Sequence, residues 1–197
     1  TTVPINDQEH NQGEHAEHPD HRMCGLATFL VADAMTFAGF FAAYLTFKAV
    51  NPLPDGAIYE LELPLPILNT VLLLVSSATF HRAGQAIRQD DHGRCRRWLL
   101  ITAGLGLAFL VSQMVEYFTL PFGLTDNLYA STFFAATGFH GLHVTLGALM
   151  ILIVWWQARQ PQGRVTAADH FPLEAAELYW HFVDGIWVIL FVILYLL

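Results

Sequence analysis

The chain has 197 residues, of which 54% are hydrophobic and only 13% are charged. Soluble domains carry about 25% charged residues, so this composition excludes an ordinary soluble domain, and its apolar content also excludes a disordered chain. The formal net charge is −8, with only nine lysines and arginines. This argues against nucleic-acid binding, which needs clustered basic residues. The composition indicates an integral membrane protein with several spans.

Residues 1–22 are polar, and several histidines stand among their acidic residues: His10, His15, His18 and His21. A metal site is one interpretation of this pattern. The spacing is loose, however, and nothing around it would fix a coordination geometry. We therefore expect a solvated, disordered N-terminal tail, followed by one membrane domain over residues 23–197.

Five apolar stretches follow the tail, each longer than the ~20 residues that a helix needs to cross about 30 Å of hydrocarbon. They lie at about 23–49, 65–88, 97–118, 130–157 and 175–197. Several contain glycines, which weaken helices in water but let helices in a bilayer approach closely. The sequence therefore predicts an all-α integral membrane bundle of five transmembrane helices.

Basic residues predict the orientation of this bundle. The second connection is rich in arginine: Arg82, Arg88, Arg94, Arg96 and Arg97. Arg159 and Arg164 belong to the fourth connection, whereas the first and third are mainly acidic. The positive-inside rule places the second and fourth connections in the cytoplasm. With five spans, the N-terminus is then cytoplasmic and the C-terminus lies on the outer side.

Ionisable side chains inside the spans are candidate functional residues, because each is costly at membrane depth unless it has a partner. With one adjacent tryptophan, the candidates are Asp33, Glu116, His140, His143, Glu177, Trp180, His181 and Asp184. His140 and His143 share one face of the fourth span, and Glu177, His181 and Asp184 share one face of the fifth.

These residues have three interpretations. A helical di-iron site would use a Glu-x-x-His pair on each of two helices, and that spacing is absent here. A proton or ion path would need more than isolated carboxylates on three helices. Hydrogen bonding between helices and toward a partner subunit explains most positions. We therefore expect one satisfied polar cluster, without metal, formed by His140, His143, Glu177, His181 and Asp184.

Longer motifs resemble subunit III of the haem–copper terminal oxidases. They are STFFAATGFHGLHV at 131–144, HFPLEAAELYWHFVD at 170–184 and LPLPILNT at 63–70, together with Glu116-Tyr117. The resemblance covers about residues 22–197. The chain is similar to the five-span bacterial form, because it lacks the first two of the seven spans found in mitochondrial members. It also has Ala32-Asp33 where the family has Ser-Glu, so the carboxylate is one methylene shorter.

The resemblance implies a subunit that carries no catalytic, cofactor-binding or metal-binding residue of its own. Haem and copper are expected on subunits I and II, and a bound phospholipid is compatible with this chain. The implied role is to stabilise subunit I during turnover, to support proton uptake and to shape a route for oxygen. The complex would couple oxidation of cytochrome c and reduction of oxygen to water with proton pumping.

The expected partners are oxidase subunits I and II, membrane lipids and, through the complex, cytochrome c or a similar donor. The candidate polar residues would then serve structural, lipid or subunit contacts. The expected location is the bacterial cytoplasmic membrane, or the thylakoid membrane in a photosynthetic bacterium. Three alternatives stay open: subunit III of a quinol oxidase, a stand-alone membrane metalloenzyme and a transporter. The YWHFVD segment at 179–184 favours the cytochrome c branch.

Overall fold

Five long helices make up most of the computed structural model, which describes residues 21–50, 63–159, 165–166 and 170–197. The helices are α1 (His21–Val50), α2 (Pro64–Arg88), α3 (His92–Thr119), α4 (Leu128–Gln157) and α5 (Phe171–Phe191). A π-helical turn, Val192–Leu196, continues α5. Each of the five spans is long and apolar enough to cross a membrane. The predicted all-α architecture with five membrane-spanning helices is confirmed.

The helices begin before the apolar stretches that predicted them, and in α3 and α4 a polar cap starts the first turn. α1 begins at His21, whereas His10, His15 and His18 of the predicted tail lie outside the described residues. The side chain of Asp91 accepts a hydrogen bond from the backbone N–H of Arg94 and caps α3. Asn127 caps α4 in the same way. Such caps satisfy backbone N–H groups that a helix start leaves unpaired.

α2 and α3 form a hairpin whose turn is only a few residues long. Asp90 adopts a φ of 60° there, in the left-handed region that aspartate tolerates better than most residues. The backbone N–H groups of Asp90 and Asp91 donate to the carbonyls of Ile87 and Ala86, at 2.9 and 3.0 Å. These bonds close the end of α2 and start α3 antiparallel beside it.

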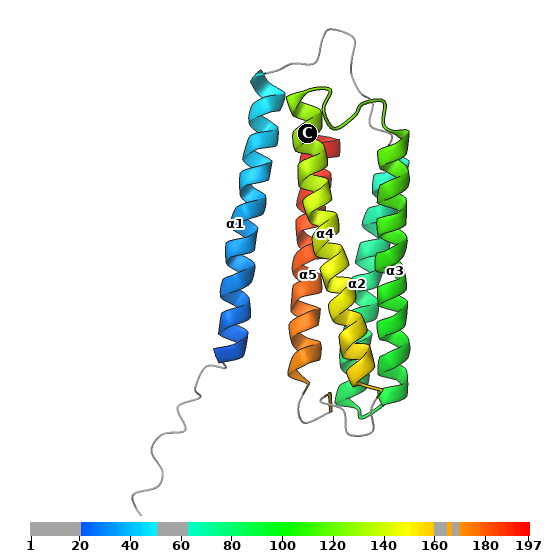
Figure 1. Ribbon diagram of the computed structural model, residues 1–197. Helices are drawn as coiled ribbons and strands as arrows, with labels where there is room; N and C mark the ends of the chain where they lie inside the picture. The colour runs from blue at the N-terminus through cyan, green and yellow to red at the C-terminus, as the bar shows by residue number, and fades with distance from the viewer. Residues whose placement is uncertain (1–20, 51–62, 160–164, 167–169) are drawn as a thin grey trace, which may run out of the picture.

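The helices lie side by side with their axes nearly aligned (Figure 1). α1 stands at one edge and the α2–α3 hairpin at the opposite edge, with α4 and α5 between them. α1 packs on α4 and α5, while α5 also packs on α2 and α4 on α3. This arrangement places α4 and α5 at the centre, where their polar side chains meet several neighbours.

The outward surface of the bundle is covered largely by apolar side chains. Met35 of α1, Leu107 and Val111 of α3, and Leu149 and Ile153 of α4 are each at least half exposed. A soluble protein rarely exposes an apolar surface of this extent, whereas a bilayer solvates it. The chain is therefore a multi-pass membrane protein, as its composition predicted.

Candidate functional site: polar contacts between the helices

Asp33 of α1 contacts His143 of α4 within the bundle. The two carboxylate oxygens lie 3.2 and 3.1 Å from Nε2 of His143, and the side chains are only 11% and 7% exposed. Nδ1 of His143 lies 2.8 Å from the carbonyl oxygen of Phe139. A carbonyl only accepts, so Nδ1 is the donor, and Nε2 is the ring nitrogen that faces the carboxylate of Asp33.

His140 lies one turn before His143 but has different surroundings. It is fully buried, and the rings of Phe109, Trp187 and Phe37 lie 5.6, 5.2 and 6.5 Å from its centroid. No hydrogen-bond partner for either ring nitrogen is found among the described residues. His140 therefore packs as part of an aromatic layer and does not connect to the neighbouring polar contacts.

A second polar group joins α2 to α5 around the carboxylate of Glu177. Its Oε1 lies 3.1 Å from Nδ1 of His81 and 3.6 Å from Nε2 of His181. Nδ1 of His181 contacts the hydroxyl of Ser77. Gly84 leaves room for the carboxylate, since a Cβ there would lie 2.9 Å from Oε2. Glu177 therefore contacts one histidine of α2 and one histidine of α5.

This group continues in both directions along α2 and α5. Toward the end where α2 turns into α3, Glu174 lies 3.5 Å from Arg88 and 3.0 Å from His170. In the other direction Asp184 is buried, and the hydroxyl of Ser77 interacts with its carboxylate. Neither Asp184 oxygen has a well-formed hydrogen bond among the described residues.

We call these two neighbouring groups of contacts, together with Asp184, the α2–α5 polar ladder. Its members are Ser77, His81, Arg88, His170, Glu174, Glu177, His181 and Asp184. At 1.5 Å per residue, the ladder extends about 20 Å along α5 from Phe171 to Asp184. This length is more than half the thickness of a hydrocarbon core of about 30 Å.

At the opposite end of the bundle, Glu116 of α3 is buried beside the last turn of the chain. The hydroxyl of Tyr195 donates to its Oε1 at 2.7 Å, and Nε2 of Gln113 donates to its Oε2 at 3.2 Å. Tyr44 joins the same end of the bundle through Tyr129, with 3.0 Å between their hydroxyls. These contacts link α3 to the π-helical turn and α1 to α4.

Trp180 fills the centre of the bundle between α2, α3 and α4. Its indole N–H donates to Oγ of Ser76 at 2.9 Å, and the side chain is fully buried. A Cβ at Gly106 would lie 2.7 Å from the ring, and one at Gly147 would lie 2.8 Å from it. Both glycines are therefore required for the ring to fit.

The polar residues of α4 and α5 do not form the single cluster that we expected, and that prediction was wrong. His143 pairs with Asp33 of α1, His140 lies among aromatic rings, and Glu177 and His181 pair with His81 of α2. α4 and α5 each pack against more than one helix, so residues a turn apart meet different neighbours. The sequence showed which residues share a face of one helix, but it did not show which neighbouring helix each of them contacts.

Sequence reasoning missed two important partners. His81 interrupts an apolar stretch, so the criterion that singled out His140 would have found it. Tyr195 gave no comparable signal, because its contact with Glu116 depends on how the π-helical turn directs the side chain. Among the described residues, no group of three or more histidine, cysteine, aspartate or glutamate side chains is arranged to hold a metal ion.

Comparison with known proteins identifies the family. A family model described as cytochrome c oxidase subunit III matches residues 5–197. The chain belongs to this family. Its curated relatives include "Cytochrome c oxidase subunit 3" of Synechocystis sp., 51% identical over 184 residues, which cover 93% of this chain and 78% of the relative. The protein of the same name from Thermostichus vulcanus is 46% identical over 187 residues, covering 93% and 92%. That from Tragelaphus imberbis is 38% identical over 178 residues, covering 87% and 67%.

Family membership confirms the resemblance that the sequence motifs indicated. The chain is a terminal oxidase subunit III and hence a member of a multi-subunit oxidoreductase complex in a membrane. The motif at 131–144 contributes His140 and His143, and the motif at 170–184 contributes Glu177, His181 and Asp184. The first motif therefore supplies the buried His140 and the contact with α1, and the second supplies most of the α5 residues of the polar ladder.

Proposed function

We propose that this chain is a non-catalytic subunit that docks on subunit I of a cytochrome c oxidase and stabilises it during turnover. One observation carries the proposal: the α2–α5 polar ladder exposes ionisable side chains within two helices that are long and apolar enough to span a membrane. The side chains of His81 and His181 are 57% and 40% exposed. Counted from the helix ends, they lie about 10 and 15 Å along their helices.

Hydrocarbon cannot accept or donate hydrogen bonds, so imidazoles exposed to lipid would be costly there. Intramembrane ionisable residues normally face a protein interior or a water-filled cavity. The outward positions of α3 and α4 carry apolar side chains such as Leu107 and Leu149 instead. The α2–α5 face is therefore the surface that we assign to the partner subunit.

A double variant, His81→Leu with His181→Leu, tests this docking surface. It should co-purify with less of subunits I and II in mild detergent, because Leu replaces the groups offered to the partner. The matched control is Thr145→Leu on α4, an exposed position whose hydroxyl donates to the Gly141 carbonyl of its own helix. Equal recovery of subunits I and II with both variants would contradict the docking surface.

The stabilising role predicts how a complex without this chain behaves. A core of subunits I and II should still reduce oxygen, but it should inactivate faster during turnover. Complete loss of oxygen reduction at the first turnover, with normal haem and copper content, would contradict the proposal. It would place an essential chemical group on this chain.

We assign the redox centres to the partner subunits, with haem and copper on subunits I and II. The chain expressed alone should then show no haem absorbance and no oxygen consumption. Stoichiometric iron in the purified chain would favour a stand-alone metalloenzyme.

The names of the relatives support cytochrome c as the electron donor. Oxidation of quinol but not of cytochrome c by the purified complex would favour the quinol oxidase alternative.

We also propose that the subunit supports proton uptake and oxygen access to subunit I. The polar ladder supports the first role, since titratable side chains extend from the predicted cytoplasmic end toward Asp184. Proton uptake measured with a pH-sensitive dye should slow in the double histidine variant, and oxygen affinity should fall when the chain is deleted.

We propose that the subunit lies in the bacterial cytoplasmic membrane, or in the thylakoid membrane of a photosynthetic bacterium. Fractionation of the two membranes would test this location.

A further inference from the structure

Two adjacent hollows lie where α2 turns into α3. The first, of about 330 Å³, is lined by Arg82, Gln85, Ala86, Gln89, Arg94 and Trp98. The second, of about 360 Å³, is lined by Arg94, Arg97, Trp98 and Ile101. Both volumes fall within the ~300–1,000 Å³ of small-molecule sites. Because Arg94 and Trp98 belong to both hollows, the two form one continuous basic site.

The charge of this site is strongly positive. Arg82 and Arg97 form no ion pair with any carboxylate of the described chain. The guanidinium of Arg82 lies 5.0 Å from the centre of the Trp98 ring. Nε of Arg94 lies 3.4 Å from Oδ2 of Asp91. The other oxygen of this carboxylate, Oδ1, accepts the backbone N–H that caps α3. Arg82 and Arg94 thus line the first hollow and Arg94 and Arg97 line the second, with Asp91 the one carboxylate that pairs with any of these arginines in the described chain.

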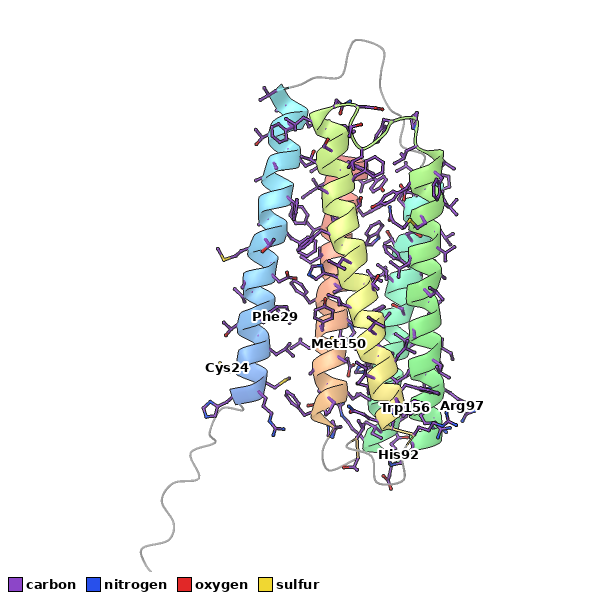
Figure 2. All side chains as sticks on the ribbon, in the orientation of Figure 1. Cys24, Phe29, His92, Arg97, Met150 and Trp156 are labelled. Carbon is purple, nitrogen blue, oxygen red and sulfur yellow. The ribbon has the colours of Figure 1, made fainter. Side chains whose placement is uncertain are left out.

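The site changes from basic to apolar along α3. Figure 2 shows Arg97 and His92 at the end of the bundle where α2 meets α3. Trp98 follows directly, a residue type that favours the membrane–water interface. Ile101 lines the second hollow, and Leu107 and Val111 continue the exposed surface toward the bundle centre. A ligand that fills the site is therefore anionic at one end and apolar at the other.

We propose that this site binds an anionic glycerophospholipid. Its phosphate would contact Arg82, Arg94 and Arg97, and an acyl chain would lie along α3 over Ile101. Guanidinium groups suit this ligand because their N–H donors match phosphate oxygens in pairs. Basic pockets between transmembrane helices on the cytoplasmic side are known to hold anionic headgroups. Inorganic phosphate would satisfy the basic end alone and leave the apolar surface unused.

The test uses the full chain in its purified complex, with retained lipid measured by native mass spectrometry. The probes are phosphatidylglycerol, phosphatidylcholine and inorganic phosphate, each added after delipidation. The variants are Arg97→Gln alone and Arg82→Gln, Arg94→Gln and Arg97→Gln combined. The matched control is Arg159→Gln, which removes an arginine at the end of α4 whose guanidinium lies 5.8 Å from the Trp155 ring.

The wild-type complex should bind phosphatidylglycerol in preference to phosphatidylcholine. Arg97→Gln should weaken this binding about fivefold, and the triple variant by more than tenfold, while Arg159→Gln matches the wild type. Because Arg97 makes no described ion pair, its single variant tests the site without disturbing the fold. The proposal is overturned if the triple variant retains phosphatidylglycerol, if phosphatidylcholine binds equally, or if millimolar phosphate displaces the lipid completely.

Discussion

The carboxylate of Asp33 lies 3.1 Å from Nε2 of His143, and this contact joins α1 to the centre of the bundle. Both side chains are nearly buried, so water cannot readily replace either one as the partner of the other. α1 also contributes Tyr44, whose hydroxyl lies 3.0 Å from that of Tyr129. The edge helix is therefore held by one polar contact in its first half and another in its second.

Asp33→Ala should loosen α1, because His143 would remain buried without its partner. Removing one member of a buried pair costs about 3–5 kcal/mol. Asp33→Asn keeps a polar side chain and should have a smaller effect. We expect both variants to shorten the catalytic lifetime of the complex more than they lower its initial rate, as measured from oxygen-consumption curves.

Met35→Ala is the control for this prediction, since Met35 is on the same helix and 72% exposed. Its decay during turnover should match that of the wild type. Identical decay curves for Asp33→Ala and the wild type would show that the contact with His143 does not hold α1 in the working complex.

Gly147→Ala should destabilise the bundle, because its Cβ would meet the Trp180 ring at 2.8 Å. Gly106→Ala should do the same from the opposite side, at 2.7 Å. Such overpacking costs about 1–3 kcal/mol. The measurement is the melting temperature of the purified complex, which both variants should lower.

Gly104→Ala is the matched control, since nothing lies within 4 Å of a Cβ at that position. It should leave the melting temperature unchanged or raise it. Trp180→Phe tests the contact directly: in that background, Gly147→Ala should cost less than in the wild type. Additive effects of the two substitutions would exclude a direct clash.

The sequence predicts the helices of this structure better than it predicts the contacts at the site. Runs of apolar residues predicted the five spans because a bilayer requires about 20 of them per helix. The polar contacts were less predictable. Their spacing puts His140 and His143 on one face of any helix. Whether each contacts a carboxylate or an aromatic ring depends on the helices that pack against α4. Pairing such as Asp33 with His143 is set by tertiary packing across 110 residues of chain.

Asp184→Asn should affect the isolated chain and the complex in opposite directions. The carboxylate is only 5% exposed and has no well-formed hydrogen bond among the described residues. A buried polar group without a partner costs about 1–3 kcal/mol, and a charged one costs more. Asn cannot ionise and has nearly the same volume, so the isolated chain should melt at a higher temperature.

Assembly with subunit I should instead become weaker in Asp184→Asn, if the docked partner supplies the missing donor. The second readout is the amount of subunit I recovered with the variant at equal expression. Val188→Ala, at an exposed apolar position of α5, is the control and should change neither quantity in this way. A parallel loss of stability and assembly would show that Asp184 serves only the fold of this chain.

The last prediction concerns Tyr195, whose hydroxyl donates to the buried carboxylate of Glu116 at 2.7 Å. Tyr195→Phe would leave that oxygen without its donor, while Gln113 still serves the other one. Hydrogen bonds to charged groups contribute about 1.5–3 kcal/mol, against about 0.5–1.5 kcal/mol for neutral pairs. Tyr117→Phe is the comparison, because the Tyr117 hydroxyl also lies 2.7 Å from its acceptor, but that acceptor is the Thr137 hydroxyl. We therefore expect Tyr195→Phe to lower the melting temperature of the complex more than Tyr117→Phe. If the two variants lose the same stability, the contact with Glu116 has no charged character and holds the π-helical turn no more strongly than a neutral hydrogen bond.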